Sequence, residues 1–374
     1  MRVLIYQRIV PHYRVRFFEA LHTRLKKVGI EMQLVYGNHR DGYVPEGVDI
    51  DQEWAVKVNN RYLSIFGQEI VFQGGFSALR GKPCLVIVEQ ASRLTLNYLI
   101  HLSKRTYGFK LAYWGHGQNF QCPEVGIKSV LKNLLLKQVD HFFAYTTSSM
   151  NILTERGFDR RNVTVVDNSI DTTKLQFELS QCSDAQIEKI RRDLEIDSDT
   201  IGLFCGGLDE RKEFDFLFQA CDRIKNELSA FNIIFIGHGP KMMELKEFAA
   251  SRPWVHVVGP ITGQEKAAYF TLARCLVMPG ALGLVVIDSF VSSTPMVTTE
   301  IETHSPEFDY LISGENSLIT KVDIDEFSKQ VVMLFKDQGL HARLQEGGRA
   351  SATQFTLANM VERFAIGIEN TLTE

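Results

Sequence analysis

Short apolar runs alternate with amphipathic stretches along the whole chain. The apolar runs cover residues 2–6, 32–36, 84–88, 110–114, 140–144 and 163–166, and then 201–205, 232–236, 255–258, 275–278 and 296–298. Helical patterns fill segments between and after them, at residues 16–28, 185–194, 214–224 and 355–372. Continuous apolar strands that alternate with helices are typical of parallel sheets covered on both faces. The pattern therefore predicts an α/β protein with two Rossmann-like, doubly wound parallel sheets.

A polar segment separates the two halves. Residues 173–198 are rich in Gln, Asp, Glu and Ser, and a new strand pattern starts at Ile201. A chain of 374 residues is long enough for two or three domains. We expect an N-terminal domain over residues 1–172, a linker over 173–198, a C-terminal domain over 199–354, and a closing helix over 355–374 that returns toward the N-terminal domain.

The composition is that of a soluble globular protein, with 45% hydrophobic and 23% charged residues. The net charge of −4 does not favour a nucleic-acid partner. The six cysteines are scattered, without a C-x-x-C pair, which argues against structural zinc and for reduced thiols. No apolar run approaches the roughly 20 residues that span a bilayer, and the first residues do not resemble a signal peptide. We expect a cytoplasmic protein.

The charge is unevenly distributed. Residues 1–175 carry a net charge of +8, and residues 176–374 carry −12. The first helical pattern also has a basic face, made of Arg14, Arg16, Arg24, Lys26 and Lys27. This face could rest on an anionic membrane surface, or it could be an ordinary solvated face of a helix that packs inward.

Three glycine turns follow predicted strands in the second half. One contains Gly280 and Gly283 and leads into a helix near Leu284, whose first amides could bind a phosphate. Another holds Arg211 and Lys212, two adjacent cations that suit a diphosphate. The third covers residues 236–240. A glycine turn alone is often just a tight connection, but the carboxyl ends of parallel strands share one edge, so we expect the three turns to converge.

The second half carries Gly206-Gly-Leu208 with Lys212, Gly237-His-Gly-Pro240, Val258-Gly-Pro-Ile261, Gly280-Ala-Leu-Gly-Leu284 with Asp288, Thr294-Pro-Met-Val-Thr298, and His304-Ser-Pro-Glu307 before Gly314. In this set of motifs it resembles the donor domain of retaining GT-B glycosyltransferases of the family-4 type. The first half is similar at 114–117 and 165–171, and the tail at 355–360 resembles the closing helix of the family. Each piece is weak alone, but as a set they cover nearly the whole chain.

This resemblance implies two domains facing a cleft and a nucleotide-sugar donor held by the second domain. The donor-binding residues that it implies are Gly206, Gly207, Gly237, Gly239, Pro260, Ile261, Gly280, Leu282, Gly283, Leu284, Val285 and Asp288. Two departures stand out. The first acid of the family motif, which usually contacts the transferred sugar, is Gly280, and the family arginine is Gly207. We expect Asp288 to accept ribose hydroxyls, and Arg211 either to supply the missing cation or to be exposed to solvent.

The first half supplies the candidate acceptor side. His12, Tyr13 and Arg14 follow the first strand, where an acceptor could bind, although Tyr13 could instead be a helix staple and Arg14 a surface charge. Glu89 could orient an acceptor hydroxyl or merely cap a helix. His116 lies between glycines at a position that matches an active-site histidine of the family. Asn119 completes the predicted acceptor contacts.

The sequence thus predicts a retaining glycosyltransferase that moves a sugar from a nucleotide-diphosphate sugar to a saccharide or lipid-linked saccharide, in polysaccharide or glycolipid assembly. His116, Lys212 and Arg211 are the expected catalytic residues. No metal site or further cofactor is expected, and the location is cytoplasmic or at the inner membrane face. The alternatives are a nucleotide-sugar 2-epimerase of similar fold and a catalytically degenerate GT-B binding subunit. A phosphorylase is disfavoured because it would need a longer chain.

Overall fold

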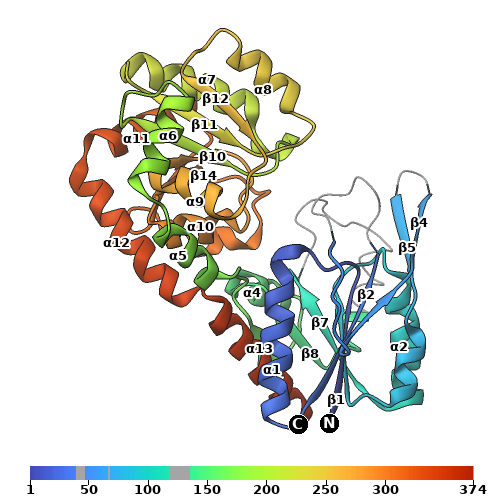
Figure 1. Ribbon diagram of the computed structural model, residues 1–374. Helices are drawn as coiled ribbons and strands as arrows, with labels where there is room; N and C mark the ends of the chain where they lie inside the picture. Colours follow the sequence, from blue (N-terminus) through green and yellow to red (C-terminus); the bar gives the residue numbers. More distant parts are fainter. Residues whose placement is uncertain (39–46, 66–67, 118–134, 374) are drawn as a thin grey trace. The chain divides into compact units, whose positions relative to one another are not determined.

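The chain folds into two compact units. The computed structural model describes residues 1–38, 47–65, 68–117 and 135–373. Unit 1 consists of Met1–Ile170 and Leu357–Glu374, and unit 2 consists of Asp171–Thr356 (Figure 1).

The segment that we expected to be a linker contains two helices and belongs to unit 2. These helices are α5 (Thr172–Ser180) and α6 (Asp184–Asp193), and both pack against α9 (Gly263–Leu272) of the same unit. Asp171 and Ser183, which look like loop residues in the sequence, accept hydrogen bonds from the first amides of α5 and α6. The polar composition of this segment therefore reflects helix caps and solvated helix faces.

Unit 1 is built on a seven-stranded parallel sheet. Its strands are β1 (Arg2–Gln7), β2 (Glu31–Gly37), β3 (Ala55–Val58), β6 (Leu85–Glu89), β7 (Lys110–Gly115), β8 (His141–Ala144) and β9 (Val163–Val165). Their order is β3-β2-β1-β6-β7-β8-β9. An antiparallel hairpin of β4 (Asn60–Ile65) and β5 (Gln68–Gln73) lies outside this sheet. The sequence analysis missed β3, β4 and β5, since β3 has no buried residue and the apolar run in the hairpin is short.

Helices cover both faces of this sheet, as Figure 1 shows for α1 (Val15–Lys27), α13 (Leu357–Thr373) and α2 (Thr95–Tyr107). Phe17, Phe18 and Phe364 from α1 and α13 form one apolar cluster with the sheet. Leucine and isoleucine side chains of α2, together with α4 (Thr147–Glu155), form the cluster on the other face. Short 3-10 turns complete the unit as η1 (His12–Arg14), η2 (Phe76–Gly81) and η3 (Arg160–Asn162).

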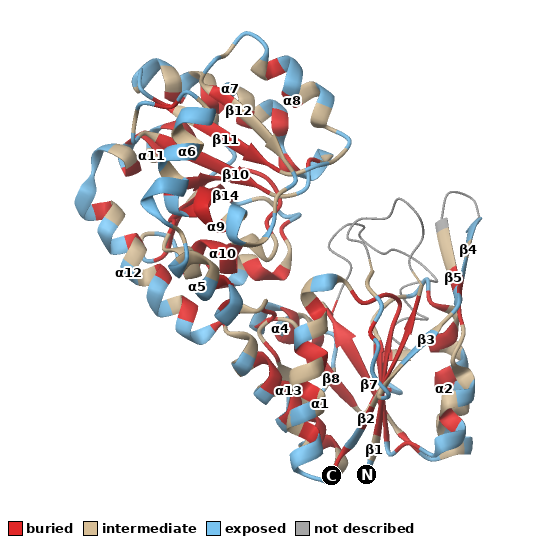
Figure 2. Cartoon of the chain, viewed as in Figure 1, coloured by how far each residue is buried: buried red, intermediate tan, exposed pale blue. Residues whose placement is uncertain are grey.

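Unit 2 is built on a six-stranded parallel sheet in the order β12-β11-β10-β13-β14-β15. The strands are β10 (Ile201–Cys205), β11 (Asn232–Ile236), β12 (Val255–Gly259), β13 (Cys275–Val277), β14 (Met296–Thr299) and β15 (Ser317–Thr320). The remaining helices are α7 (Phe214–Glu227), α8 (Met242–Ala249), α10 (Val285–Ser292), α11 (Ile324–Lys336) and α12 (Gln338–Gln354), with 3-10 turns η4 (Glu210–Lys212) and η5 (Pro306–Tyr310). The strands β10 and β11 are almost wholly buried (Figure 2).

Each sheet has a point at which the strand order reverses. In unit 1 this point lies between β1 and β6, and in unit 2 between β10 and β13. Ligands of open α/β sheets bind outside the carboxyl ends of the strands at such a point. The segments to inspect are therefore those after β1 and β6, and those after β10 and β13. Among the described residues, no helix is both long and apolar enough to cross a membrane.

Candidate functional site

The three glycine turns of unit 2 lie together at the carboxyl edge of its sheet. Backbone hydrogen bonds join them: the Gly206 amide donates to the Ile236 carbonyl at 3.0 Å, and the Ala281 amide of the turn after β13 donates to the Arg211 carbonyl at 2.8 Å. The Gly237 amide also donates to the Gly259 carbonyl at 2.9 Å, which adds the turn after β12. The turns after β10, β11 and β12 thus form one continuous rim. Pro260 and Ile261, expected near the nucleotide base, follow β12 at this rim, and Pro260 is exposed.

Packing between the turns explains two of the glycines. A Cβ atom on Gly237 would collide with the Gly206 carbonyl oxygen, and a Cβ on Gly239 would collide with the backbone of Leu208. Gly237 also has φ of 152°, which disfavours other residues. These glycines are required by the close approach of one turn to the next, so their presence does not by itself indicate a ligand.

The loop after β13 is held by the protein itself. The Thr299 hydroxyl donates to the Pro279 carbonyl at 2.6 Å, and the Ala281 amide donates to the Arg211 carbonyl at 2.8 Å. The Leu282 amide donates to Nδ1 of His304 at 3.2 Å. We expected Leu282 to contact the donor. The side chain of Leu282 is buried and its amide is engaged within the protein, and its contact with a donor stays a prediction.

His304 is a site residue that the sequence analysis did not single out. Its Nε2 donates to the Thr299 carbonyl at 2.7 Å, which leaves Nδ1 as the acceptor for Leu282. Burial lowers the pKa of His304 to about 4, so the ring is neutral near pH 7. It also stacks on Phe308, with ring centroids 4.1 Å apart. The imidazole therefore links the Thr299 carbonyl to the Leu282 amide and holds the loop after β13 in place.

Gly280 marks the position of the first acid in the family motif, and its surroundings leave no room for a side chain. A Cβ there would lie under 3.0 Å from three backbone atoms of Lys212. The backbone of η4 thus occupies the space beside residue 280. Gly280 packs against the protein, and a side chain at this position cannot be added without moving the backbone.

Lys212 is the buried cation of this edge. Its side chain comes from η4, and the residue is only 9% exposed. Nζ donates to the carbonyl of Ala281, a neutral group. Burial lowers its pKa, and in the described part of the chain no carboxylate forms an ion pair with it. The same part of the chain offers no acceptor to the amides of Gly283, Leu284 and Val285, at the start of α10.

Arg211 is oriented differently from its neighbour. Its side chain is half exposed and forms a two-point contact with Asp209, at 3.0 and 2.8 Å. The hydrogen bonds from Arg211 outweigh the effect of burial and lower the pKa of Asp209. The guanidinium is thus already paired with a carboxylate, which weakens the case for Arg211 as a replacement for the family arginine.

Asp288 is buried in the first turn of α10 and is paired with a lysine that we did not predict. Nζ of Lys266, on α9, lies 2.8 Å from Oδ1 of Asp288. Although burial opposes the charged form, the Asp288 carboxylate raises the pKa of Lys266. The signal that we overlooked is that Lys266 lies near the amino end of its helix, where the helix dipole disfavours a cation.

Unit 1 presents its candidate residues at the corresponding edge. His116 follows β7 and contacts Tyr145, with ring centroids 4.4 Å apart and the ring planes tilted by 37°. Burial, and next the charge of Arg14, lower the pKa of His116 to about 4. Glu89 accepts a hydrogen bond from the Arg8 amide at 2.8 Å, and its burial raises its pKa. Glu89 does not cap α2, whose first residue is Thr95.

The segment after β1 carries the other acceptor-side candidates. His12 is exposed. Its ring is nearly perpendicular to that of Tyr13, with the ring centroids 5.7 Å apart. Arg14 is not a surface charge, since it is only 6% exposed. Asn119 lies outside the described residues.

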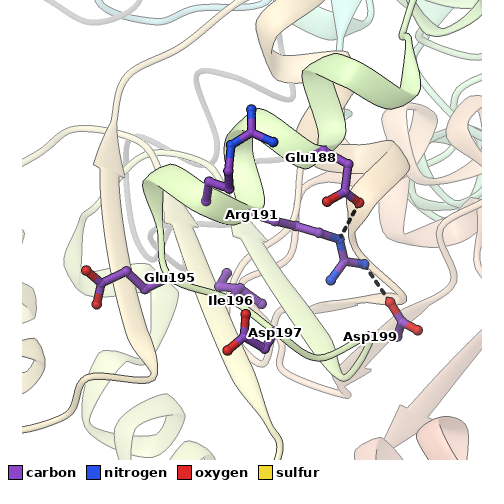
Figure 3. Close-up of a pocket in the computed structure, with 7 residues that line it drawn as sticks. Glu188, Arg191, Glu195, Ile196, Asp197 and Asp199 are labelled. Atoms are coloured by element: carbon purple, nitrogen blue, oxygen red, sulfur yellow. Dashed lines mark hydrogen bonds and ion pairs between the residues drawn. The ribbon is translucent and has the colours of Figure 1, made fainter.

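A separate pocket opens at the opposite edge of the unit 2 sheet (Figure 3). It is lined by α6 and the residues before β10, and all but one of the lining residues are charged. Arg191 forms ion pairs there with Asp199 at 2.6 Å and with Glu188 at 3.9 Å. The pocket lies before β10, away from the carboxyl ends of the strands. Among the described residues no group of His, Cys, Asp and Glu could hold a metal ion.

A family model for glycosyl transferases group 1 matches residues 199–337. The resemblance to group 1 glycosyltransferases is confirmed for this segment. The retaining mechanism and the family-4 type stay predictions. The matched segment contains every donor-side turn described above, together with Lys212, Lys266 and Asp288. No curated protein matches the chain significantly in sequence.

Solved structures with the GT-B fold match the whole chain. Anabaena Alr3699/HepE in complex with UDP is similar with a TM-score of 0.72 at 13% identity, over 99% of each chain. A glycosyltransferase from Rickettsia africae has a TM-score of 0.73 at 14% identity, over 100% of this chain and 98% of that one. A putative UDP-N-acetylglucosamine 2-epimerase from Listeria monocytogenes has a TM-score of 0.63 at 13% identity, over 99% and 96%. These similarities show the GT-B fold, as the sequence predicted.

Proposed function

We propose that this protein is a glycosyltransferase that moves a sugar from a nucleotide-diphosphate sugar to a hydroxyl group of a saccharide or lipid-linked saccharide. Unit 2 would bind the donor and unit 1 the acceptor. The observation that carries the proposal is Lys212, a buried cation without a carboxylate partner in the described chain, at the strand-order reversal of a group 1 glycosyltransferase segment.

The chemistry at this edge suits a departing diphosphate. Lys212 offers a positive charge, and the amides of Gly283, Leu284 and Val285 offer donors at the positive end of the α10 dipole. Such preorganised groups stabilise the negative charge that develops on the leaving group. The UDP that Alr3699/HepE binds is a precedent for a nucleoside diphosphate on this fold.

Asp288 and Lys266 would recognise the nucleotide rather than the sugar. Lys266 engages one carboxylate oxygen of Asp288, which leaves the other oxygen to accept ribose hydroxyls. No acid can stand at position 280, so recognition of the transferred sugar must use other groups. We propose transfer with retention and without a metal ion, with His116 and Glu89 beside the acceptor hydroxyl.

The similarity to a putative 2-epimerase favours a second candidate, a nucleotide-sugar 2-epimerase. One experiment separates the two. The protein is incubated with nucleotide-sugars, with and without a mixture of saccharide acceptors, and NMR follows the anomeric and C2 protons. A transferase releases nucleoside diphosphate only when an acceptor is present and forms a new glycosidic bond. Inversion at C2 without an acceptor would contradict the transferase, and the absence of any reaction would favour a binding subunit.

A further inference from the structure

Arg14 is a buried guanidinium in unit 1 with only neutral partners. Nη2 donates to Oδ1 of Asn168, and Nη1 contacts Sδ of Met360 at 3.5 Å. The guanidinium carbon lies 5.4–6.0 Å from the centres of four aromatic rings, those of Tyr13, Phe17, Trp114 and Tyr145.

The charge of Arg14 is therefore not balanced by the described part of the chain. None of the carboxylates there forms an ion pair with it, and Asp167, next to its partner Asn168, pairs with Arg363 at 2.5 Å instead. Aromatic rings attract a cation but do not neutralise it. By contrast, the more exposed Arg24 on α1 has two carboxylates of α13, at 2.7 and 2.9 Å. A buried charge without a counter-charge is costly, so it indicates a partner that the protein does not itself supply.

The place of Arg14 in the fold points to a ligand. It ends η1, which follows β1 at the strand-order reversal of unit 1. Tyr145 follows β8 and Asn168 follows β9, so the groups around the guanidinium come from the carboxyl ends of several strands, where ligands of such sheets bind. His116, after β7, is neutral and adds no charge of its own.

We propose that Arg14 binds an oxyanion, a phosphate or carboxylate group of the acceptor, at this edge of unit 1. Of the five N–H groups of a guanidinium, two are used by Asn168 and Met360, and a forked arrangement of the rest suits two oxygens of one anion. That the anion belongs to the acceptor rests on the proposed glycosyltransferase function, whereas the anion site itself rests on the surroundings of Arg14.

The first test measures anion binding without any turnover. Inorganic phosphate, methyl phosphate, diethyl phosphate and acetate are titrated by calorimetry, with UDP present to occupy unit 2. Wild-type protein should bind one of them, and the choice separates a terminal phosphate from a diester and from a carboxylate. Arg14→Met should weaken that binding at least tenfold, Arg14→Lys by threefold or less, and the control Arg24→Gln not at all. Equal binding by Arg14→Met, or no binding by the wild type at millimolar concentrations, would overturn the proposal.

A second measurement needs no variant and covers the case in which Arg14→Met does not fold. The ring signals of His116 are followed by NMR as a function of pH, with and without the anion that binds. An anion beside Arg14 should shift the titration of His116 upward, since it offsets the charge of Arg14, and an unchanged titration would contradict the site. If UDP does not bind while Arg14-dependent anion binding is found, the glycosyltransferase function fails and the anion site stands.

Discussion

Substitution of Gly280 by alanine should destabilise unit 2, although it adds only one methyl group. The added Cβ would come under 3.0 Å from three backbone atoms of Lys212, and backbone cannot rotate away as the end of a long side chain can. Overpacking of this kind costs about 1–3 kcal/mol, and the smaller entropy of the unfolded alanine chain returns about 0.4–1 kcal/mol. We expect a net loss of about 1 kcal/mol.

Gly283 provides the matched control in the same loop. A Cβ there would meet nothing within 4 Å, and neither glycine has positive φ, so only the packing differs. Gly283→Ala should be neutral or slightly stabilising. The entropy gain is common to both variants, so they differ by the overpacking cost of about 1–3 kcal/mol. At about 2–4 °C per kcal/mol for a unit of this size, their Tm values should differ by roughly 2–12 °C.

Scanning calorimetry of ligand-free protein measures this difference. Equal Tm values for Gly280→Ala and Gly283→Ala would refute the packing argument. Gly280→Glu, which restores the family acid, should be more damaging still and should not raise turnover. A stable and more active Gly280→Glu variant would show that the loop has room for the acid after all.

Lys266→Met should raise the Kd for a nucleoside diphosphate about tenfold, or about 1.4 kcal/mol, because it removes the cation that holds the Asp288 carboxylate toward the ribose. Lys266→Arg should keep the ion pair with Asp288 and bind almost normally. Equal calorimetric affinities of Lys266→Met and the wild type would contradict this. The free energy of unfolding should fall by up to about 1.4 kcal/mol per pH unit as the pH drops from 6.5 toward 4, because the unfolded His304 ring binds a proton at a higher pH than the folded one. Denaturant unfolding of His304→Asn at several pH values should show a smaller change of this free energy with pH. The protein should bind anionic liposomes through the exposed Lys26 and Lys27, with binding that falls with salt, since Arg24 is engaged by α13. No sedimentation with such liposomes at low salt, or sedimentation of Lys26→Gln/Lys27→Gln protein as complete as that of the wild type, would show that this face is an ordinary solvated one.

Most of the strands that the sequence predicted carry a continuous buried apolar run, although β9 has no buried residue and β12 has one. The apolar run at residues 201–205 became β10, which is buried throughout, and the helical pattern at 214–224 became α7. Solvent-exposed β3 and the short β15 carry no comparable run, so hydrophobic patterning could not find them. Local composition also concealed α5, because an Asp cap and a solvated face look like a loop.

The site was harder to foresee than the fold, because its chemistry depends on contacts between distant segments. Lys212 could be singled out from its glycine turn. The pairing of Lys266 with Asp288 joins residues on two helices, and the hydrogen bond from the Leu282 amide to His304 joins two loops. Arg14 looked like one of several basic residues on a helix face, and only the packing around it shows that it is buried. The three-dimensional contacts are also needed to distinguish glycines that could serve a ligand from glycines that the packing of turns requires.

The binding of nucleoside diphosphate to unit 2 tests the central claim most directly. Calorimetry should compare a nucleoside, its monophosphate and its diphosphate on wild-type protein, on Lys212→Met and on the control Lys246→Met, which changes an exposed lysine of α8. We expect Lys212→Met to weaken diphosphate binding by about 10–100-fold, the equivalent of a charge-assisted contact of about 1.5–3 kcal/mol, with no change for the nucleoside. Diphosphate binding that is the same in Lys212→Met and in the wild type would contradict the account.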